Sequence, residues 1–159
     1  MLELIVTLAL LAACWYGYKT WIIRSAGPKA VIRRHIPENV YEWPEHEDEF
    51  DIVGESYYQS AIRGLAGLND EHVRNKEYRA FLIPENDNPH DDKAIRIDIE
   101  GTTVGYLSRE DARSFRRRLS AKKLTGQITA CKSYVIGGQS REGNEWNYGI
   151  CLSIKNFGW

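Results

Sequence analysis

The sequence predicts a mainly β domain with some α-helix. The domain is expected to be a small barrel with one or two helices, and an N-terminal transmembrane helix is expected to precede it. Three observations lead to this prediction: several segments with alternating apolar residues after residue 50, one strong helical pattern in the middle of their order, and an uncharged apolar run near the N-terminus. The 159 residues are 43% hydrophobic and 27% charged, which excludes wholesale disorder. A net charge of −1 excludes a uniformly basic protein and leaves room for a local basic patch.

The first 24 residues have the pattern of a membrane anchor. Residues 4–18 carry no charge, and counting on through Lys19 to residue 23 gives about 20 residues and about 30 Å of helix, enough to cross a bilayer. Only Glu3 precedes this segment and several Lys and Arg residues follow it, so a single-pass protein with a cytoplasmic C-terminal domain is expected. Two alternatives remain: a buried helix, and an exported lipoprotein lipidated at Cys14, because LAAC at residues 11–14 resembles a lipoprotein cleavage box.

Residues 25–49 are expected to form a linker between this anchor and the domain. Pro28, Pro37 and Pro44 interrupt any regular element, and residues 38–55 contain eight acidic residues and no Lys or Arg. The alternative is an acidic arm that folds over a basic surface when ligand is absent. The folded domain is therefore predicted to occupy residues 50–159.

Five to six strands are predicted in this domain from apolar alternation and the glycines that separate the segments. The segments are residues 50–58, 78–83, 95–99, 104–106, 128–136 and 148–154. In the third segment, three isoleucines alternate with Arg96 and Asp98, which is typical of a half-buried strand. Gly101 follows and predicts a hairpin.

One helix is predicted after residue 108, and a second, short helix is predicted between residues 59 and 68. The former begins after Ser108, which forms a capping-box pattern with Asp111, and it continues with Ala112, Phe115 and Leu119 on one face. Residues 109–123 contain seven basic and two acidic residues, whereas the remaining chain is net acidic. Such a patch suits phosphate, although a solvated helix face is the alternative.

No motif for nucleotide hydrolysis, for a nucleophilic serine or for metal binding occurs in the sequence, so neither an enzyme nor a cofactor is expected. Cys131 and Cys151 are expected to be buried thiols. The polar segment at residues 85–92 has the highest density of side chains suited to binding or catalysis, with three carboxylates and His90 within six residues. A turn is the simplest interpretation, because Asn, Asp and Pro favour turns; the alternatives are a binding loop and a metal or acid–base site.

Three motifs resemble, in order, those of the HIRAN domain family. They are VGESYY at residues 53–58, ENDNPHDDKAI at residues 85–95 and GTTVGYLSR at residues 101–109. The resemblance covers about residues 50–155. It implies an OB-like barrel that binds DNA and that, as an accessory domain of SNF2-type fork-remodelling enzymes, captures the free 3′ end of a single strand.

The resemblance also implies roles for individual residues. Tyr57 would stack on the terminal base, Asp91 would accept a hydrogen bond from the 3′-hydroxyl, and Tyr106 and Arg109 would lie beside backbone phosphates. A carboxylate suits a strand end because the terminal 3′ oxygen is a neutral donor, whereas an internal nucleotide carries phosphate there. The predicted nucleic-acid-binding residues are Tyr57, Tyr58, His90, Asp91, Tyr106, Arg109, Arg113, Arg116 and Arg117.

Two positions depart from the family pattern. His90 stands where the family usually has a second aromatic residue, and Ser56 stands where a basic residue precedes the tyrosine pair. A histidine stacks more weakly, so weaker end capture is expected. The partners expected are single-stranded nucleic acid and, through residues 4–23, a membrane. The alternative function is a protein-interaction or structural module that keeps the barrel, binds an unknown protein partner and does not bind DNA.

Overall fold

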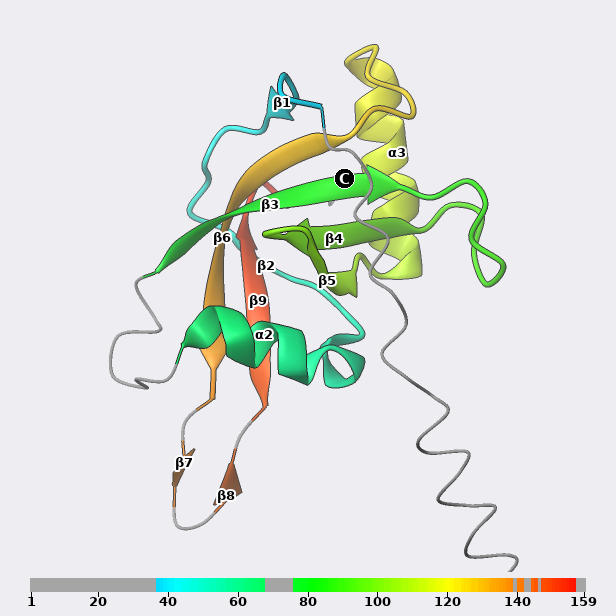
Figure 1. Cartoon of the computed structure of the whole chain (residues 1–159). Helices are drawn as coiled ribbons and strands as arrows, with labels where there is room; N and C mark the ends of the chain where they lie inside the picture. The colour runs from blue at the N-terminus through cyan, green and yellow to red at the C-terminus, as the bar shows by residue number, and fades with distance from the viewer. Residues whose placement is uncertain (1–36, 68–75, 139, 142–143, 146, 157–159) are drawn as a thin grey trace, which may run out of the picture. The chain divides into compact units, whose positions relative to one another are not determined.

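A computed structural model describes residues 37–67, 76–138, 140–141, 144–145 and 147–156 (Figure 1). The predicted anchor at residues 4–23, together with Cys14, lies outside these residues. Within the described part of the chain, no helix has the length and apolar character needed to cross a membrane.

One curved sheet of seven strands forms the body of the domain (Figure 1). Its strand order is β2-β9-β6-β3-β4-β5, and β1 pairs with β6 outside this path. Neighbouring strands are antiparallel except β1, which runs parallel to β6. The strands are β1 (Tyr41–Glu42), β2 (Glu49–Asp51), β3 (Glu77–Pro84), β4 (Ile95–Ile99), β5 (Thr102–Tyr106), β6 (Thr129–Gly137) and β9 (Tyr148–Ser153). A separate two-stranded ribbon holds β7 (Ser140–Arg141) and β8 (Asn144–Glu145).

The two ends of this strand order meet. Val53, just after β2, bridges Tyr106, the last residue of β5, and the two residues exchange backbone hydrogen bonds of 2.8 and 2.9 Å. The sheet therefore curls toward a closed form, and the described strands fit the predicted small OB-like barrel. The bridge also joins the first and third sequence motifs directly.

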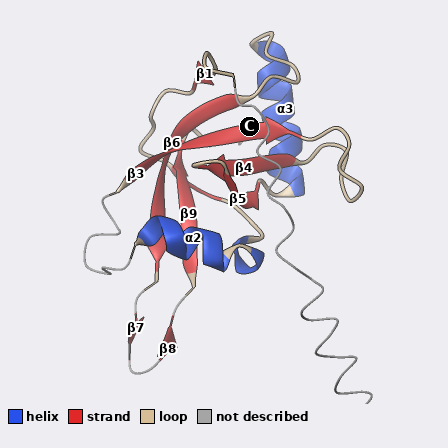
Figure 2. Cartoon of the chain, in the orientation of Figure 1, coloured by secondary structure: helices blue, strands red, loops and turns tan. Residues whose placement is uncertain are grey.

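In the described part of the chain, two α-helices and one short 3-10 helix pack on this sheet (Figure 2). They are η1 (Glu55–Tyr57), α2 (Gln59–Ala66) and α3 (Arg109–Ala121). α3 begins as predicted, because the Ser108 side chain accepts a hydrogen bond from the Asp111 backbone N–H at 3.1 Å. Its buried face carries Ala112, Phe115 and Leu119, the three residues that the helical spacing had indicated. α2 confirms the short helix.

The structure differs from the sequence prediction at two strands. The strand predicted over residues 50–58 ends at Asp51, because Gly54 has a φ of +85° and turns the chain into η1. Arg96 and Asp98, predicted on the polar face of a half-buried strand, are buried, and all five residues of β4 are buried. The charge on these two side chains is tolerated because each is the other's ion-pair partner.

Residues 41–49, which the sequence analysis placed in a linker, contribute to the sheet and the core. Trp43 is 8% exposed, packs its ring 5.5 Å from that of Phe115, and donates its indole N–H to Thr129 Oγ1 at 2.9 Å. Proline and acidic residues had indicated a linker, but β1 pairs with β6, and the hydrogen-bond partner of Trp43 lies 86 residues away. Cys131 and Cys151 are buried free thiols, as expected.

Candidate nucleic-acid interface

Tyr57 lies on a short turn that side-chain hydrogen bonds anchor to β9. Its side chain is 88% exposed, and η1 positions it just beyond the bridge that joins Val53 to Tyr106. Glu55 fixes the start of this turn, because its carboxylate accepts a hydrogen bond from the Ile150 backbone N–H at 2.7 Å. Gln59 fixes the end by bonding both backbone groups of Tyr148, with its amide nitrogen 2.7 Å from the carbonyl oxygen. The exposed ring is therefore carried by a backbone anchored to β9.

The second tyrosine of the pair turns inward. Tyr58 packs against the core, and its ring centroid lies 6.4 Å from that of Tyr106. Gly105 permits the close approach of residues 52–53 to β5, since a Cβ there would lie 2.8 Å from the Val53 carbonyl oxygen and 2.6 Å from Ile52 Cδ1. Tyr57 is therefore the exposed tyrosine of the pair, and Tyr58 is partly buried.

The β3–β4 loop carries His90 and Asp91 in a turn made by Asn88. Asn88 Oδ1 accepts hydrogen bonds from the backbone N–H groups of His90, at 2.9 Å, and Asp91, at 3.4 Å. One carboxylate oxygen of Asp91 accepts from the Lys93 N–H at 2.9 Å. These bonds are the local turn bonds that Asn and Asp were expected to make. His90 is exposed, whereas the Asp91 side chain is 13% exposed.

Arg109 joins this loop to the start of α3. Its Nε lies 3.8 Å from the second carboxylate oxygen of Asp91, and an Nη group donates to the His90 carbonyl oxygen at 3.4 Å. The Arg109 side chain is 75% exposed, so the ion pair is weak and the guanidinium remains accessible. The second and third motifs are thus in contact here, while the first and third are in contact at Tyr106.

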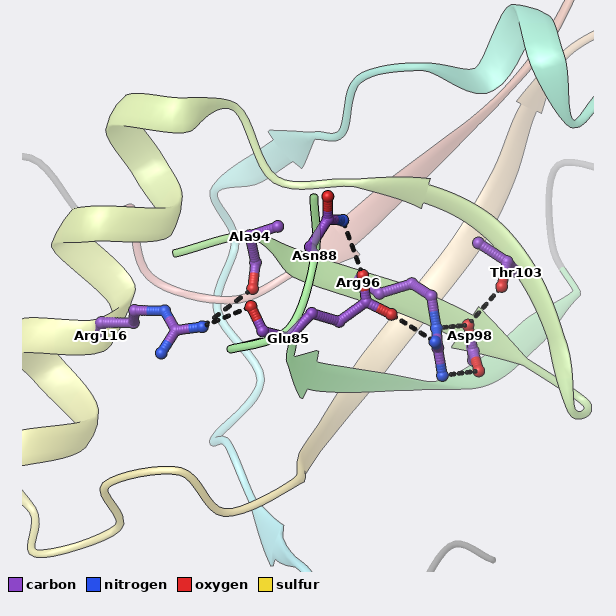
Figure 3. Close-up of polar contacts among 7 residues, drawn as sticks. All are labelled: Glu85, Asn88, Ala94, Arg96, Asp98, Thr103 and Arg116. Atoms are coloured by element: carbon purple, nitrogen blue, oxygen red, sulfur yellow. Dashed lines mark hydrogen bonds and ion pairs between the residues drawn. The ribbon is translucent and has the colours of Figure 1, made fainter. Parts of the chain in front are cut away.

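A buried ionic network lies beneath the loop, and the sequence analysis did not identify it (Figure 3). Arg96 donates Nε and one Nη to the two oxygens of Asp98, at 2.8 and 3.1 Å, and its other Nη to Glu85. Thr103 also donates to Asp98, at 2.9 Å. A signal was present in the sequence: opposite charges two residues apart on a strand point to the same face.

The same network influences Tyr106. Burial first, and then the negative charge of Glu85, raises the pKa of the Tyr106 phenol well above its ordinary value. The hydroxyl therefore keeps its proton throughout the physiological range and remains a hydrogen-bond donor. A protonated donor of this kind is suited to a phosphate or hydroxyl oxygen.

The basic residues of α3 separate into two groups. Arg109, Arg113 and Arg117 are exposed and recur every four residues, so they form a stripe along one face of the helix. Arg116 instead clamps the β3–β4 loop, donating to the carbonyl oxygens of residues 85, 93 and 94 and to the Asn86 side chain. Arg118 donates to the carbonyl oxygens of residues 155 and 156. We call the first group the arginine stripe.

Within the described part of the chain, the candidate residues neither form a metal-binding group nor line the groove beside α3. Among the described residues, no three His, Cys, Asp or Glu side chains are grouped so that they could hold a metal ion. A groove of about 400 Å³ lies near the other end of α3, and none of the predicted binding residues lines it. Its lining residues are Trp43, Pro44, His46, Arg118, Lys122, Ile154, Lys155 and Asn156. The candidate residues comprise the exposed ring of Tyr57 and, on the β3–β4 loop and α3, the pair of Asp91 with the exposed Arg109.

Comparison with known proteins assigns the family. The model of the HIRAN domain matches residues 47–141, more than half of the chain. Neither the curated proteins nor the solved structures yield a match. The matched residues contain all three motifs together with η1, the β3–β4 loop and α3, which build the candidate site. The chain belongs to the HIRAN domain family.

Proposed function

We propose that this chain recognises the 3′ end of single-stranded DNA. Family membership indicates nucleic-acid binding, and the observation that supports the finer proposal is the exposed ring of Tyr57. A tyrosine 88% exposed on an anchored turn contributes little to the core. Stacking a base on such a ring contributes about 1–3 kcal/mol and does not depend on base identity.

Asp91 supplies the preference for an end. Its Oδ1 accepts a hydrogen bond from the Lys93 N–H, and its Oδ2 lies 3.8 Å from Nε of Arg109. A terminal 3′-hydroxyl donates to such an oxygen. A phosphate in the same place would repel it, by about 1 kcal/mol in water and about 4 kcal/mol near a protein surface for two charges about 4 Å apart. Arg109 and the protonated Tyr106 hydroxyl then serve the neighbouring phosphates.

The arginine stripe continues the path of the strand away from its end. Arg109, Arg113 and Arg117 lie on one exposed face of α3, whose first residue is next to Asp91. Cations along this face neutralise successive phosphates and release counterions. Arg116 belongs to the predicted set, but its contacts support a role in holding the loop.

The experiment is fluorescence anisotropy of the full-length chain in detergent with labelled oligonucleotides that end in 3′-hydroxyl or 3′-phosphate. Shortening the chain to residue 45 would remove Trp43 from the core, so the full chain is required. We expect about tenfold tighter binding to the 3′-hydroxyl end. Equal affinity for the two ends would refute end recognition, and absence of binding to either would favour a protein-interaction module.

Two variants test the roles within this proposal. Tyr57→Ala is expected to weaken binding to all sequences about equally, whereas Tyr134→Ala, at a partly exposed tyrosine on β6, serves as the control. Asp91→Asn keeps an oxygen for the Lys93 N–H and is expected to remove the preference for the 3′-hydroxyl. Asp92→Asn removes the same charge from an exposed position in the same loop and should leave that preference intact.

A membrane location remains part of the proposal. We propose that residues 4–23 span a membrane once and that the domain faces the cytoplasm, which is supported by the apolar run and by the Lys and Arg residues after it. Resistance of the protein to alkaline extraction from membranes tests the anchor. Incorporation of labelled palmitate that is lost in Cys14→Ser would favour the lipoprotein alternative.

A further inference from the structure

We infer that Glu85 and Arg96 are positioning residues for end recognition, because they orient the Asn88 amide that sets the turn presenting Asp91. The inference rests on the proposed function and adds the device by which the recognition loop is held. A continuous series of hydrogen bonds leads from the barrel to this turn (Figure 3). Its members are Thr103, Asp98, Arg96, Glu85 and Asn88.

The series has a definite donor and acceptor at each contact. Arg96 donates to one oxygen of Glu85, and the Asn88 amide nitrogen donates to the other at 2.9 Å. Since the amide nitrogen of Asn88 must face this carboxylate, its oxygen faces the opposite way. That oxygen is the acceptor for the backbone N–H groups of His90 and Asp91. The orientation of a side-chain amide is thus determined by the carboxylate beneath it.

A carboxylate at position 85 cannot be replaced by an amide without a conflict. Glu85 is buried and uses both oxygens as acceptors, one toward Arg96 and one toward Asn88. An amide offers only one acceptor, so its nitrogen would face a donor on one side or the other. Relief of the conflict on the loop side requires the Asn88 amide to rotate, which turns a donor toward the N–H groups of His90 and Asp91.

Arg116 holds a different part of the same loop. Its guanidinium donates to the carbonyl oxygens of Glu85, Lys93 and Ala94, which lie where the loop leaves and rejoins the sheet. The turn at residues 88–91 depends instead on Asn88 and hence on Glu85. Loss of the Glu85–Asn88 contact is therefore expected to disturb the turn while Arg116 keeps the loop attached.

The test compares two single variants with their combination. Glu85→Gln and Asn88→Asp each disrupt the donor–acceptor pairing between positions 85 and 88. The first places two donors together, and the second places two carboxylates together. In the combined variant, the amide at position 85 donates to the new carboxylate at position 88 and accepts from Arg96, while that carboxylate still accepts from the two backbone N–H groups. The combination also keeps the net charge of the wild type.

The readout is the ratio of affinities for oligonucleotides that end in 3′-hydroxyl and 3′-phosphate. Each single variant is expected to lower this ratio about fivefold to tenfold, and the combination to restore it to within about twofold of wild type. Thermal unfolding is measured in parallel, since a merely structural role predicts a lower melting temperature with an unchanged ratio. If Glu85→Gln does not fold, Asn88→Asp alone tests the contact from the half-buried loop side.

The outcomes separate this inference from the proposed function. A wild-type ratio near one overturns both. A wild-type preference that Asp91→Asn removes but Glu85→Gln and Asn88→Asp leave intact overturns the positioning inference alone. Loss in both single variants without recovery in the combination also overturns it, because the donor–acceptor match would then not be the cause.

Discussion

The arginine stripe makes a quantitative prediction about salt. Replacing Arg113 and Arg117 by serine removes two exposed cations from α3 and leaves Arg116 and its hold on the β3–β4 loop in place. Each phosphate contact on a single strand contributes about 0.7 to the slope of log affinity against log salt. The double variant should therefore have a slope less steep by about 1.4, and each single variant by about 0.7.

This change in slope is large enough to measure. Between about 50 and 200 mM salt, the affinity of the wild type should fall about sevenfold more than that of the double variant. The assay is anisotropy titration of the full-length chain with a single-stranded oligonucleotide at four or more salt concentrations. The single and double stripe variants should bind more weakly than the wild type at low salt, and their affinities should approach that of the wild type at high salt.

A matched control decides whether the effect is local. Arg79, on β3, is about half exposed and pairs with Glu42 of β1, so Arg79→Ser removes the same charge from the sheet instead of α3. Its slope should equal that of the wild type. Equal slopes in all variants would refute the assignment and leave the stripe as a solvated helix face. An equal change in the control and the stripe variants would point to net charge alone.

Two further predictions concern stability. Burial raises the pKa of Glu55 above its usual 4.5, so the native state binds this proton more tightly than the unfolded state and stability falls as pH rises through the raised pKa. The free energy of unfolding of Glu55→Gln, measured in urea, should therefore exceed that of the wild type at pH 7, and this difference should disappear below pH 4. A difference that does not change with pH would contradict burial as the cause. Phe115→Ala should cost about 3–5 kcal/mol, because the ring is fully buried against Trp43. Ser120→Ala, exposed on the same helix, should change stability by less than about 0.5 kcal/mol, and a similar loss in both variants would contradict this.

Elements whose signals are local were predictable from the sequence. The hairpin of β4 and β5 follows from alternation around Gly101, and the start of α3 follows from Ser108 and Asp111. The pair β6 and β9 likewise follows from two apolar alternating segments joined by a glycine-containing loop. In each case, the residues that determine the element lie within it or within a few positions of it.

Features that depend on distant partners were not predictable. The tyrosine pair was assigned to a strand, whereas β2 ends at Asp51 and Gly54, just after the bridge from Val53 to Tyr106, turns the chain into η1, which carries Tyr57. The acidic segment before residue 50 was assigned to a linker because nothing near Trp43 indicates that Thr129 and Phe115 are its partners. Alternation along a single strand likewise cannot show that Arg96 pairs with a second carboxylate, Glu85, from outside that strand.

The basic run on α3 shows the same limit at the level of the site. Arg116, Arg117 and Arg118 are adjacent in sequence, yet successive helical residues point about 100° apart. Arg116 therefore reaches the β3–β4 loop, Arg118 reaches the last described residues, and Arg117 lies on the exposed stripe. Sequence composition counts all three equally, and only the neighbours of the helix distinguish the cation that faces solvent from the two that bind backbone carbonyls.

The polar segment at residues 85–92 was expected to form a turn, with a binding loop and a metal or acid–base site as the alternatives. The turn is present, since Asn88 accepts from the backbone N–H groups of two later residues. The same bonds determine where Asp91 is presented, and the bonds beneath Asn88 determine which way its amide faces. If the proposed strand end binds here, a turn held by these hydrogen bonds should lose less conformational entropy on binding than a flexible loop would. Disturbing the Glu85–Asn88 contact should therefore reduce selectivity for the end more than overall affinity, because Tyr57 and the arginine stripe are held by separate contacts.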